Sequence, residues 1–250
     1  MSNLQIHWKT PPSSWSLKGT EAHVWAAALD ISSELLCAYA KTLSGNERER
    51  ARRFHFERDQ KHFIAGRGTL RAILGSYLKM QPAGLQFEYG PRGKPMVAKI
   101  EDNPTLHFNL AHSDGLLVVA VTEHCSIGVD VERVRLMEQA DDLVERFFSP
   151  NEAKKLRGLP VHQRTRAFFN LWTRKEACLK ATGDGIAERL HEIAVSFLPD
   201  EPVRVLNAFS DTEPATAVWT LAELSPAEEY AAAIAAAAPR LDLSCWRWSQ

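Results

Sequence analysis

Cysteine is scarce in this 250-residue chain, and its placement excludes several kinds of site. The four cysteines are scattered along the sequence, and none belongs to a C-x-x-C pair: Cys37, Cys125, Cys178 and Cys245. This spacing argues against a disulfide framework and a structural zinc site, and it favours a reducing compartment. The first residues also lack a basic stretch followed by an apolar one, so we expect no signal peptide.

Long apolar runs and an excess of one charge are lacking too. The longest apolar run, from Ala231 to Ala238, is far shorter than the ~20 residues that cross a bilayer. The formal net charge is -1, which gives no general attraction to nucleic acid or to an anionic membrane. We therefore expect a soluble, cytoplasmic monomer with no nucleic-acid or membrane partner.

Familiar catalytic signatures are missing as well. The sequence contains neither G-x-S-x-G nor H-E-x-x-H, which argues against a serine hydrolase and against a zinc protease. The turn from Gly90 to Pro95 contains a Gly-Lys pair, but Pro95 stands where a P-loop requires serine or threonine. Any phosphate chemistry must therefore come from other groups.

What the chain does contain is a faint internal repeat. Ser44 with Glu47, and Ser149 with Glu152, each have the spacing of a capping box that opens a basic helical stretch. The β-rich run at 116–121 and the alanine-rich run at 230–235 each follow a similar short motif. We predict an α+β fold of two similar halves, residues 1–122 and 123–250. Each half would be a small sheet packed on helices, with the active site in the cleft between them.

The individual elements are predicted from apolar periodicity and turn residues. Helices are expected near 31–40, 45–54, 59–80, 138–147, 150–158 and 161–182, and strands near 5–8, 23–28, 86–89, 105–110, 116–122, 126–134, 193–198, 216–223 and 230–236. Alanine favours helix at 230–236, but the counterpart at 116–122 is β-rich, so we predict strands for both. Only a short turn separates strands 116–122 and 126–134, which predicts a hairpin at the junction of the halves.

The predicted strand at 126–134 carries a pair of acids. Ile127, Val129 and Val131 alternate with polar positions, so they would share one face of the strand. Asp130 and Glu132 would then lie together on the other face. Alternating acids on a strand can also be only its solvated side.

The predicted helix at 161–182 carries a second pattern. Trp172, Glu176 and Lys180 recur every four residues, so a helix places them along one side. Glu176 and Lys180 can be an ordinary surface ion pair. The helix is also rich in large apolar residues, however, so most of it must be packed, and this favours a pair that lines a cavity.

Together these side chains suit phosphate chemistry. Three carboxylates without histidine or cysteine partners, namely Asp130, Glu132 and Glu176, favour Mg²⁺ or Mn²⁺ over zinc. Lys180, one helical turn beyond Glu176, would neutralise charge that builds on a leaving phosphate.

Basic residues provide a second group of candidates. The stretch from Arg48 to Arg71 has a local surplus of positive charge, in which Arg50 and Arg53 share one helix face. The glycine-containing turn around Lys94 lets backbone approach an anion. His112 and Ser113 follow a predicted strand and could reach a phosphate, although a lone His-Ser pair is uninformative.

Taken together, these segments resemble the Sfp-type 4′-phosphopantetheinyl transferases. The family signature Gly-(Ile/Val)-Asp-x-Glu matches Gly128–Glu132, and the later Trp-x-x-Lys-Glu-x-x-x-Lys matches Trp172–Lys180. Three further family segments match at Arg52–Phe54, Gly93–Pro95 and Phe108–Ser113. All occur in the family's order, and the family's pseudo-two-fold fold agrees with the internal repeat.

By this resemblance, the chain would move 4′-phosphopantetheine from coenzyme A to a serine of an apo acyl carrier protein or peptidyl carrier domain, releasing 3′,5′-ADP. Asp130, Glu132 and Glu176 would hold Mg²⁺, with Mn²⁺ as an alternative. Glu176 would also be the general base, and Lys180 would stabilise the leaving phosphate. Arg50, Lys94 and His112 would contact coenzyme A phosphates, with Arg53 and Ser113 as further candidates.

Two alternatives stay open. One is an Mg²⁺-dependent phosphodiesterase that uses the same carboxylates. The other is an RNA- or DNA-binding module built on the stretch from Arg48 to Arg71, which the near-neutral charge disfavours.

One departure from the family lies at Glu47, where relatives often have lysine, so phosphate binding on that helix would depend on arginines alone.

Overall fold

The computed structural model describes residues 7–101, 103–137, 140–183, 187–207 and 218–249. The helices within these ranges are α1 (Ser33–Thr42), α2 (Gly45–Arg52), α3 (Glu57–Leu78), α4 (Ala140–Phe147), α5 (Pro150–Gly158) and α6 (Val161–Thr182), with 3₁₀ helices η1 (Pro82–Gly84) and η2 (Ala187–Glu192). The strands are β1 (Trp8–Lys9), β2 (Glu21–Ala28), β3 (Phe87–Tyr89), β4 (Pro95–Val97), β5 (His107–Ser113), β6 (Leu116–Thr122), β7 (Ile127–Arg133), β8 (Ala194–Val195), β9 (Val205–Asn207), β10 (Thr220–Leu224), β11 (Tyr230–Ala236) and β12 (Asp242–Arg247).

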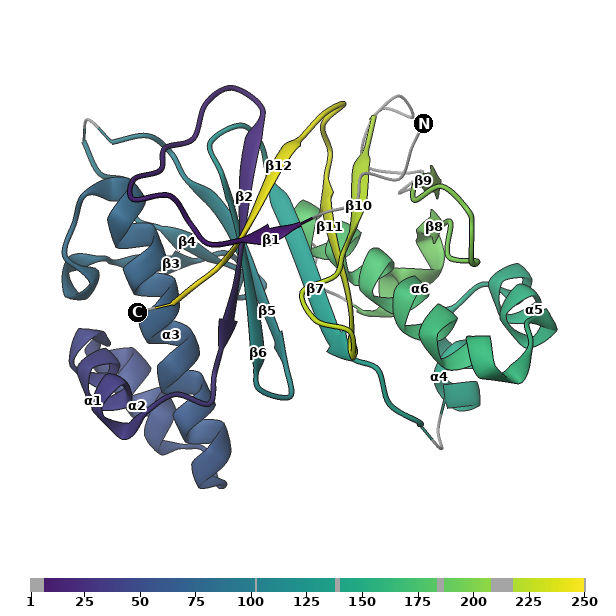
Figure 1. The fold of residues 1–250 in the computed structure, drawn as a ribbon, viewed down its shortest axis with the longest axis horizontal. Coiled ribbons are helices and arrows are strands. Elements are labelled where there is room, and N and C mark those ends of the chain that lie inside the picture. The colour runs from purple at the N-terminus through teal and green to yellow at the C-terminus, as the bar shows by residue number, and fades with distance from the viewer. Residues whose placement is uncertain (1–6, 102, 138–139, 184–186, 208–217, 250) are drawn as a thin grey trace.

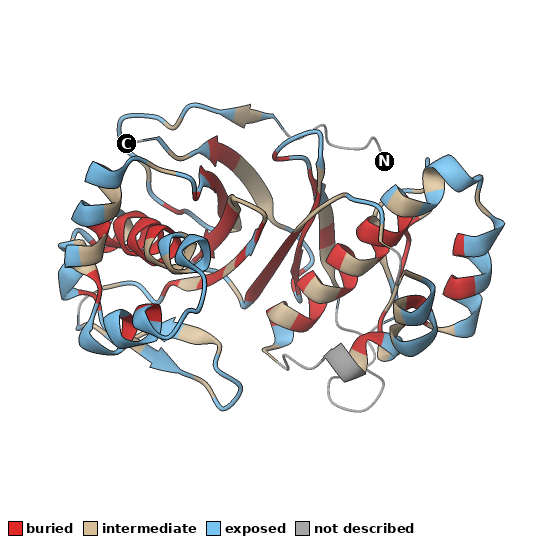
Figure 2. Ribbon diagram, turned by 90° about the horizontal axis from the view of Figure 1, so that it is seen from below, coloured by how far each residue is buried: buried red, intermediate tan, exposed pale blue. Residues whose placement is uncertain are grey.

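Two sheets form the middle of the molecule, and helices cover their outer sides (Figure 1). The first sheet has the strand order β1-β12-β2-β6-β5, and the second has the order β10-β11-β7. Helices α1 to α3 lie beside the first sheet and α4 to α6 beside the second. Figure 2 shows that buried residues concentrate on the strands and along α3 and α6. Among the described residues, no helix is both long and apolar enough to cross a membrane.

Alternation along the strands divides the core into layers. On β6, Leu117, Val119 and Val121 pack toward the helices of the first half. Val118 and Ala120 face the other way, into a central layer shared with β7 and β11 of the second sheet. A third layer joins β11 to α6. Because both faces of β6 are buried, its sequence is a continuous apolar run.

The predicted two-fold similarity of the halves is confirmed. The antiparallel order β2-β6-β5 in the first sheet matches β7-β11-β10 in the second. Both capping boxes form, one at Ser44 and the other at Ser149. Each leads to a long helix of 22 residues, α3 or α6. The alanine-rich segment is a strand, β11, because it lies in the middle of its sheet between β7 and β10.

The predicted hairpin between strands 116–122 and 126–134 is wrong. In the described sheets, β6 pairs with β2 and β5, whereas β7 pairs with β11. Both edges of β6 are therefore occupied, and the turn after Thr122 carries the chain across to the second sheet. The junction of the halves is formed instead by β5 and β7.

Several other strand predictions differ in extent. The strand expected at 105–110 is β5, which continues to Ser113, and the one expected at 193–198 is only the two-residue β8. The first residues of the expected strands 5–8 and 216–223, and of the expected helix 138–147, lie outside the described residues. Strands β4, β9 and β12 were not predicted.

The last strand changes how the halves are divided. β12 pairs in parallel with β2, and β1 pairs in parallel with β12, so both chain ends join the first sheet. The division into 1–122 and 123–250 stays a prediction, with the amendment that Asp242–Arg247 packs with the first half.

Candidate active site

Strand β7 lies directly against helix α6 because one of its residues has no side chain. A Cβ atom added to Gly128 would lie 2.0 Å from the Ala177 carbonyl oxygen and 2.3 Å from the Ala181 amide nitrogen. The two backbones are therefore in contact. This contact places Asp130, two residues along the same face of β7, beside the last turns of α6.

The predicted faces of both elements are confirmed. Ile127, Val129 and Val131 are fully buried in the central layer. The opposite face of β7 and one side of α6 line a single cavity of about 390 Å³. Its lining residues come from both halves: Leu110, Ala111, His112, Asp130, Glu132, Trp172, Glu176 and Lys180. The cavity is thus a cleft between the halves, as predicted.

Asp130 is the most buried acid of this cavity, with 5% of its surface exposed. Its Oδ1 atom accepts a hydrogen bond from Lys180 Nζ at 2.6 Å, whereas Oδ2 is buried and has no hydrogen-bond partner among the described residues. Burial raises the pKa of Asp130 above its usual range, although Lys180 acts in the opposite direction. Burial of a carboxylate oxygen without a hydrogen bond destabilises the folded state, and a bound cation would offset this cost.

The other two carboxylates share this electrostatic environment. The pKa values of Glu132 and Glu176 are both raised, mainly by burial and additionally by the negative charge of Asp130. Glu132 Oε2 accepts a hydrogen bond from the Ser113 hydroxyl at 2.7 Å. The three carboxylates therefore repel one another across a partly desolvated space.

These carboxylates are not arranged as a finished metal site. Within the described part of the chain, no three His, Cys, Asp or Glu side chains are grouped closely enough to hold a metal ion. Lys180 occupies one oxygen of Asp130, and Ser113 occupies one of Glu132. A divalent cation would need these side chains to exchange their present partners for the ion.

His112 lies at the exposed rim of the same cavity. Burial of the imidazole lowers its pKa, and the neighbouring His62 and Lys180 lower it further. His62, which was not singled out in the sequence, contacts Asp30 at 2.8 Å. Only its position on α3 relative to β5 reveals that it lies near the site.

Lys94 lies outside this cavity, beside the end of α6. Its Nζ atom donates to the Lys180 carbonyl oxygen at 2.6 Å and contacts the Ile127 carbonyl oxygen at 3.3 Å. Burial lowers the pKa of Lys94 to about 8. Lys94 therefore provides a positive charge at the negative end of the helix, and it lines a separate pocket of about 290 Å³.

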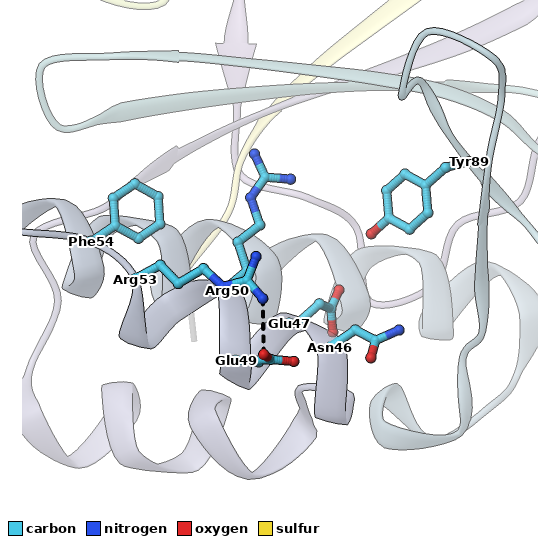
Figure 3. Close-up of a pocket in the computed structure, with 7 residues that line it drawn as sticks. All are labelled: Asn46, Glu47, Glu49, Arg50, Arg53, Phe54 and Tyr89. Carbon is cyan, nitrogen blue, oxygen red and sulfur yellow. Dashed lines mark hydrogen bonds and ion pairs between the residues drawn. The ribbon is translucent and has the colours of Figure 1, made fainter.

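Arg50 and Arg53 line a third cavity, of about 770 Å³, on α2 (Figure 3). Phe54 and Tyr89 lie on opposite sides of it, with the arginines between them. Arg53 forms an ion pair with Glu49 at 2.9 Å, and the Arg50 guanidinium lies 5.4 Å from the Phe63 ring centre. These arginines do not line the cavity that contains the acids.

Glu47, the residue that departs from the family pattern, has a structural role. It completes the capping box of α2, is 4% exposed and pairs with Arg71 at 2.6 Å. Glu152 in the other half is its counterpart, since it completes the capping box of α5 and pairs with Lys175 at 2.6 Å. Glu47 is therefore held by internal contacts at the base of the cavity that Arg50 and Arg53 line.

Comparison with known proteins agrees with this arrangement. A family model described as "4'-phosphopantetheinyl transferase superfamily" matches residues 126–235, and one described as "4'-phosphopantetheinyl transferase, N-terminal" matches residues 29–124. Each model covers one half of the fold.

Individual relatives extend the similarity over nearly the whole chain. The chain is 42% identical over 234 residues to 4'-phosphopantetheinyl transferase HetI of Nostoc sp., covering 94% of this chain and 95% of that protein. It is 35% identical to a putative 4'-phosphopantetheinyl transferase of Synechocystis sp., covering 72% and 71%. It is 28% identical to 4'-phosphopantetheinyl transferase Sfp of Bacillus subtilis, covering 70% and 75%. The resemblance drawn from the motifs is thereby confirmed: this chain belongs to the Sfp-type 4′-phosphopantetheinyl transferase family of enzymes.

Proposed function

We propose that this protein transfers 4′-phosphopantetheine from coenzyme A to a serine of an apo acyl carrier protein or peptidyl carrier domain. The observation that carries the proposal is one cavity between the halves. It brings together Asp130, Glu132, Glu176 and Lys180, the residues that match the family signature. Family membership supports the same reaction class.

In the proposed reaction, the carrier serine oxygen forms a bond to the β-phosphorus of coenzyme A. The bond from that phosphorus to the bridging oxygen breaks, and 3′,5′-ADP leaves with the bridging oxygen. Glu176 takes the serine proton, directly or through a water. Its raised pKa, caused by burial and by Asp130, makes it a stronger base than an exposed glutamate.

The cations would bind the substrate's charges. Lys180, which is 28% exposed, would release Asp130 and stabilise negative charge on the leaving phosphate. His112 lies at the rim of the same cavity, where it would contact the pyrophosphate. Lys94 and Arg50 would contact other phosphates of coenzyme A. Arg53 is a weaker candidate, because Glu49 already neutralises it.

The donor set fits a Mg²⁺ ion, with Mn²⁺ as an alternative. Asp130, Glu132 and Glu176 supply only oxygen atoms, and the buried Oδ2 of Asp130 has no partner in the part of the chain that the structure describes. We propose that these three carboxylates hold the metal. When bound, the metal would neutralise charge on the pyrophosphate oxygens.

Mass spectrometry tests the proposed function. After incubation of the protein with coenzyme A, Mg²⁺ and a panel of apo carrier proteins, at least one carrier should gain one phosphopantetheine group on serine. Cleavage of coenzyme A without modification of any carrier would support the phosphodiesterase alternative instead. The panel also identifies the carrier that is preferred.

Mg²⁺ should stabilise the protein at neutral pH. Folding raises the pKa values of three carboxyl groups, those of Asp130, Glu132 and Glu176. In the unfolded chain these groups have the usual carboxyl pKa of about 4. At pH values between the unfolded and the folded pKa, the folded state therefore binds more protons than the unfolded state. Their contribution to stability therefore falls as pH rises through this window. We expect Mg²⁺ to raise the melting temperature at neutral pH and to lose this effect as the pH falls through the same window, where protons compete.

The control for this prediction is the variant Asp130→Asn, measured by calorimetry in chelator and in Mg²⁺. Without metal at neutral pH, it should melt at least as high as the wild type, because a buried negative charge has been removed. Addition of Mg²⁺ should raise the melting temperature of this variant only slightly. If Mg²⁺ raised the melting temperatures of the wild type and of Asp130→Asn equally, the assignment of Asp130 as a ligand would be wrong.

The remaining predictions concern partners and location. Several basic side chains of the stretch from Arg48 to Arg71 are neutralised within the protein, as Arg58 is by Asp114 and Lys61 by Glu57. This supports the proposal that nucleic acid is not a partner. The monomeric state and the cytoplasmic location stay predictions.

A further inference from the structure

Side chains, rather than a backbone ladder, join β5 to β7 at the junction of the halves. Asn109 Oδ1 accepts a hydrogen bond from the Val129 amide at 2.9 Å. The Ser113 hydroxyl oxygen accepts one from the Arg133 amide at 3.2 Å. In the described sheets, the backbone of β5 pairs with β6 and that of β7 pairs with β11. These two side chains therefore link β5 to β7, in addition to the apolar layer that the halves share.

The two contacts form a regular pair. Each joins residues that are 20 apart in sequence, so β5 and β7 run in the same direction along the junction. Asn109 and Ser113 lie four residues apart on β5 and point the same way, since strand side chains repeat every two residues. Both are buried, with 6% and 9% of their surfaces exposed. The two bonds thus link the strands at corresponding positions, four residues apart.

Ser113 makes one additional bond that Asn109 does not. Its hydroxyl donates to Glu132 Oε2 at 2.7 Å, while the same oxygen accepts from the Arg133 amide. A hydroxyl has only one proton to donate. That proton is committed to Glu132, so none is left for a phosphate of coenzyme A.

We propose that Ser113 is a positioning residue that fixes the Glu132 carboxylate for metal binding, and that it is not a contact for coenzyme A. The first half of the chain thereby orients a metal ligand that belongs to the second half. This inference rests on the proposed function, because it takes Glu132 as a ligand. Partners that orient a ligand in this way typically change metal affinity by ~10–100-fold.

Asn109 provides a matched control. The variants Ser113→Ala and Asn109→Ala each remove one bond to a β7 amide, so both should lower the melting temperature by a few degrees. Only Ser113→Ala also releases Glu132. A purely structural role for Ser113 predicts equal effects of the two variants on metal binding, whereas a positioning role predicts different effects.

The experiment is a titration of the full chain with Mn²⁺ alone, in which electron paramagnetic resonance measures the free ion. We expect Ser113→Ala to weaken Mn²⁺ binding ~10-fold or more. Asn109→Ala should bind Mn²⁺ with an affinity within about twofold of the wild type. Ser113→Thr keeps the hydroxyl and should recover most of the Mn²⁺ affinity. The KM of Ser113→Ala for coenzyme A at saturating metal should stay unchanged.

Three results would overturn the inference. Equal Mn²⁺ affinity of wild type and Ser113→Ala removes the positioning role and leaves the proposed function intact. A raised KM for coenzyme A with unchanged Mn²⁺ binding assigns the hydroxyl to the substrate. Failure of the wild type itself to bind Mn²⁺ removes the metal assignment along with the inference, while carrier modification, measured separately, still decides whether the transferase function holds.

Discussion

Replacement of Glu176 by glutamine is expected to lower kcat for phosphopantetheine transfer by ~10²–10³-fold or more. The glutamine side chain has nearly the same shape, but it cannot take the serine proton and carries no charge toward a metal. Glu176 is partly exposed in the cavity and forms no part of the core. The fold should therefore be retained, and the melting temperature should not fall. The measurement is the rate at which an apo carrier gains phosphopantetheine, followed by mass spectrometry.

The exposed residue Glu123, in the turn between β6 and β7, gives the control. Glu123→Gln makes the same chemical change outside the cavity, and its kcat should equal that of the wild type. Transfer by Glu176→Gln at near wild-type rate would mean that another group accepts the proton. The proposed mechanism would then be wrong at its central step.

Replacement of Gly128 by alanine is expected to reduce the free energy of unfolding by more than about 3 kcal/mol, beyond the usual range for overpacking. The new methyl group would lie 2.0 Å from the Ala177 carbonyl oxygen and 2.3 Å from the Ala181 amide nitrogen. Both atoms belong to the helix backbone, so no side-chain rotation can remove the clash. Strand β7 must move away from α6, and Asp130 moves with it. Denaturant unfolding and Mn²⁺ binding should both show the loss.

Gly158, the last residue of α5, is the matched control, since a Cβ atom there would meet no atom within 4 Å. Gly158→Ala should change the unfolding free energy by no more than about 1 kcal/mol. If Gly128→Ala were as stable and as active as Gly158→Ala, the strand and helix would not need to approach so closely. The close contact between β7 and α6 would then not be what positions Asp130.

The sequence was sufficient to predict which acids line one cavity, because the relevant rules are local. Alternation on β7 places Asp130 and Glu132 on one face, and the four-residue spacing on α6 aligns Trp172 with Glu176 and Lys180. All five line one cavity. The capping boxes of α2 and α5 were predictable for the same reason, since each depends on residues only three apart.

Strand pairing was less predictable, because it depends on distant parts of the chain. The short turn after Thr122 favoured a hairpin, but β6 already has β2 and β5 as neighbours. The partner of β12 is β2, more than two hundred residues away, and nothing within Asp242–Arg247 identifies it. Short turns restrict which pairings are possible, and competition between strands selects one of them.

The partners of individual polar groups were the least predictable. The expectation that Lys94 contacts a phosphate stays a prediction, but the sequence did not reveal that its ammonium group contacts the last carbonyl oxygens of α6. Ser113 was grouped with it as a phosphate contact, yet its hydroxyl bonds to Glu132. Both contacts form between segments that are distant in sequence, so no local pattern could reveal them.

The similarity of the two halves also allows corresponding positions of their central strands to be compared. The central strands β6 and β11 have equal lengths, so Val119 corresponds to Ala233. Their cross-strand neighbours are Trp25 and Asp130, respectively. Where one half holds an acid, the other holds an indole packed among Trp15, Trp246 and Trp248. Corresponding positions of the two similar halves therefore hold different chemical groups, an aromatic cluster in the first and an acid of the cavity in the second.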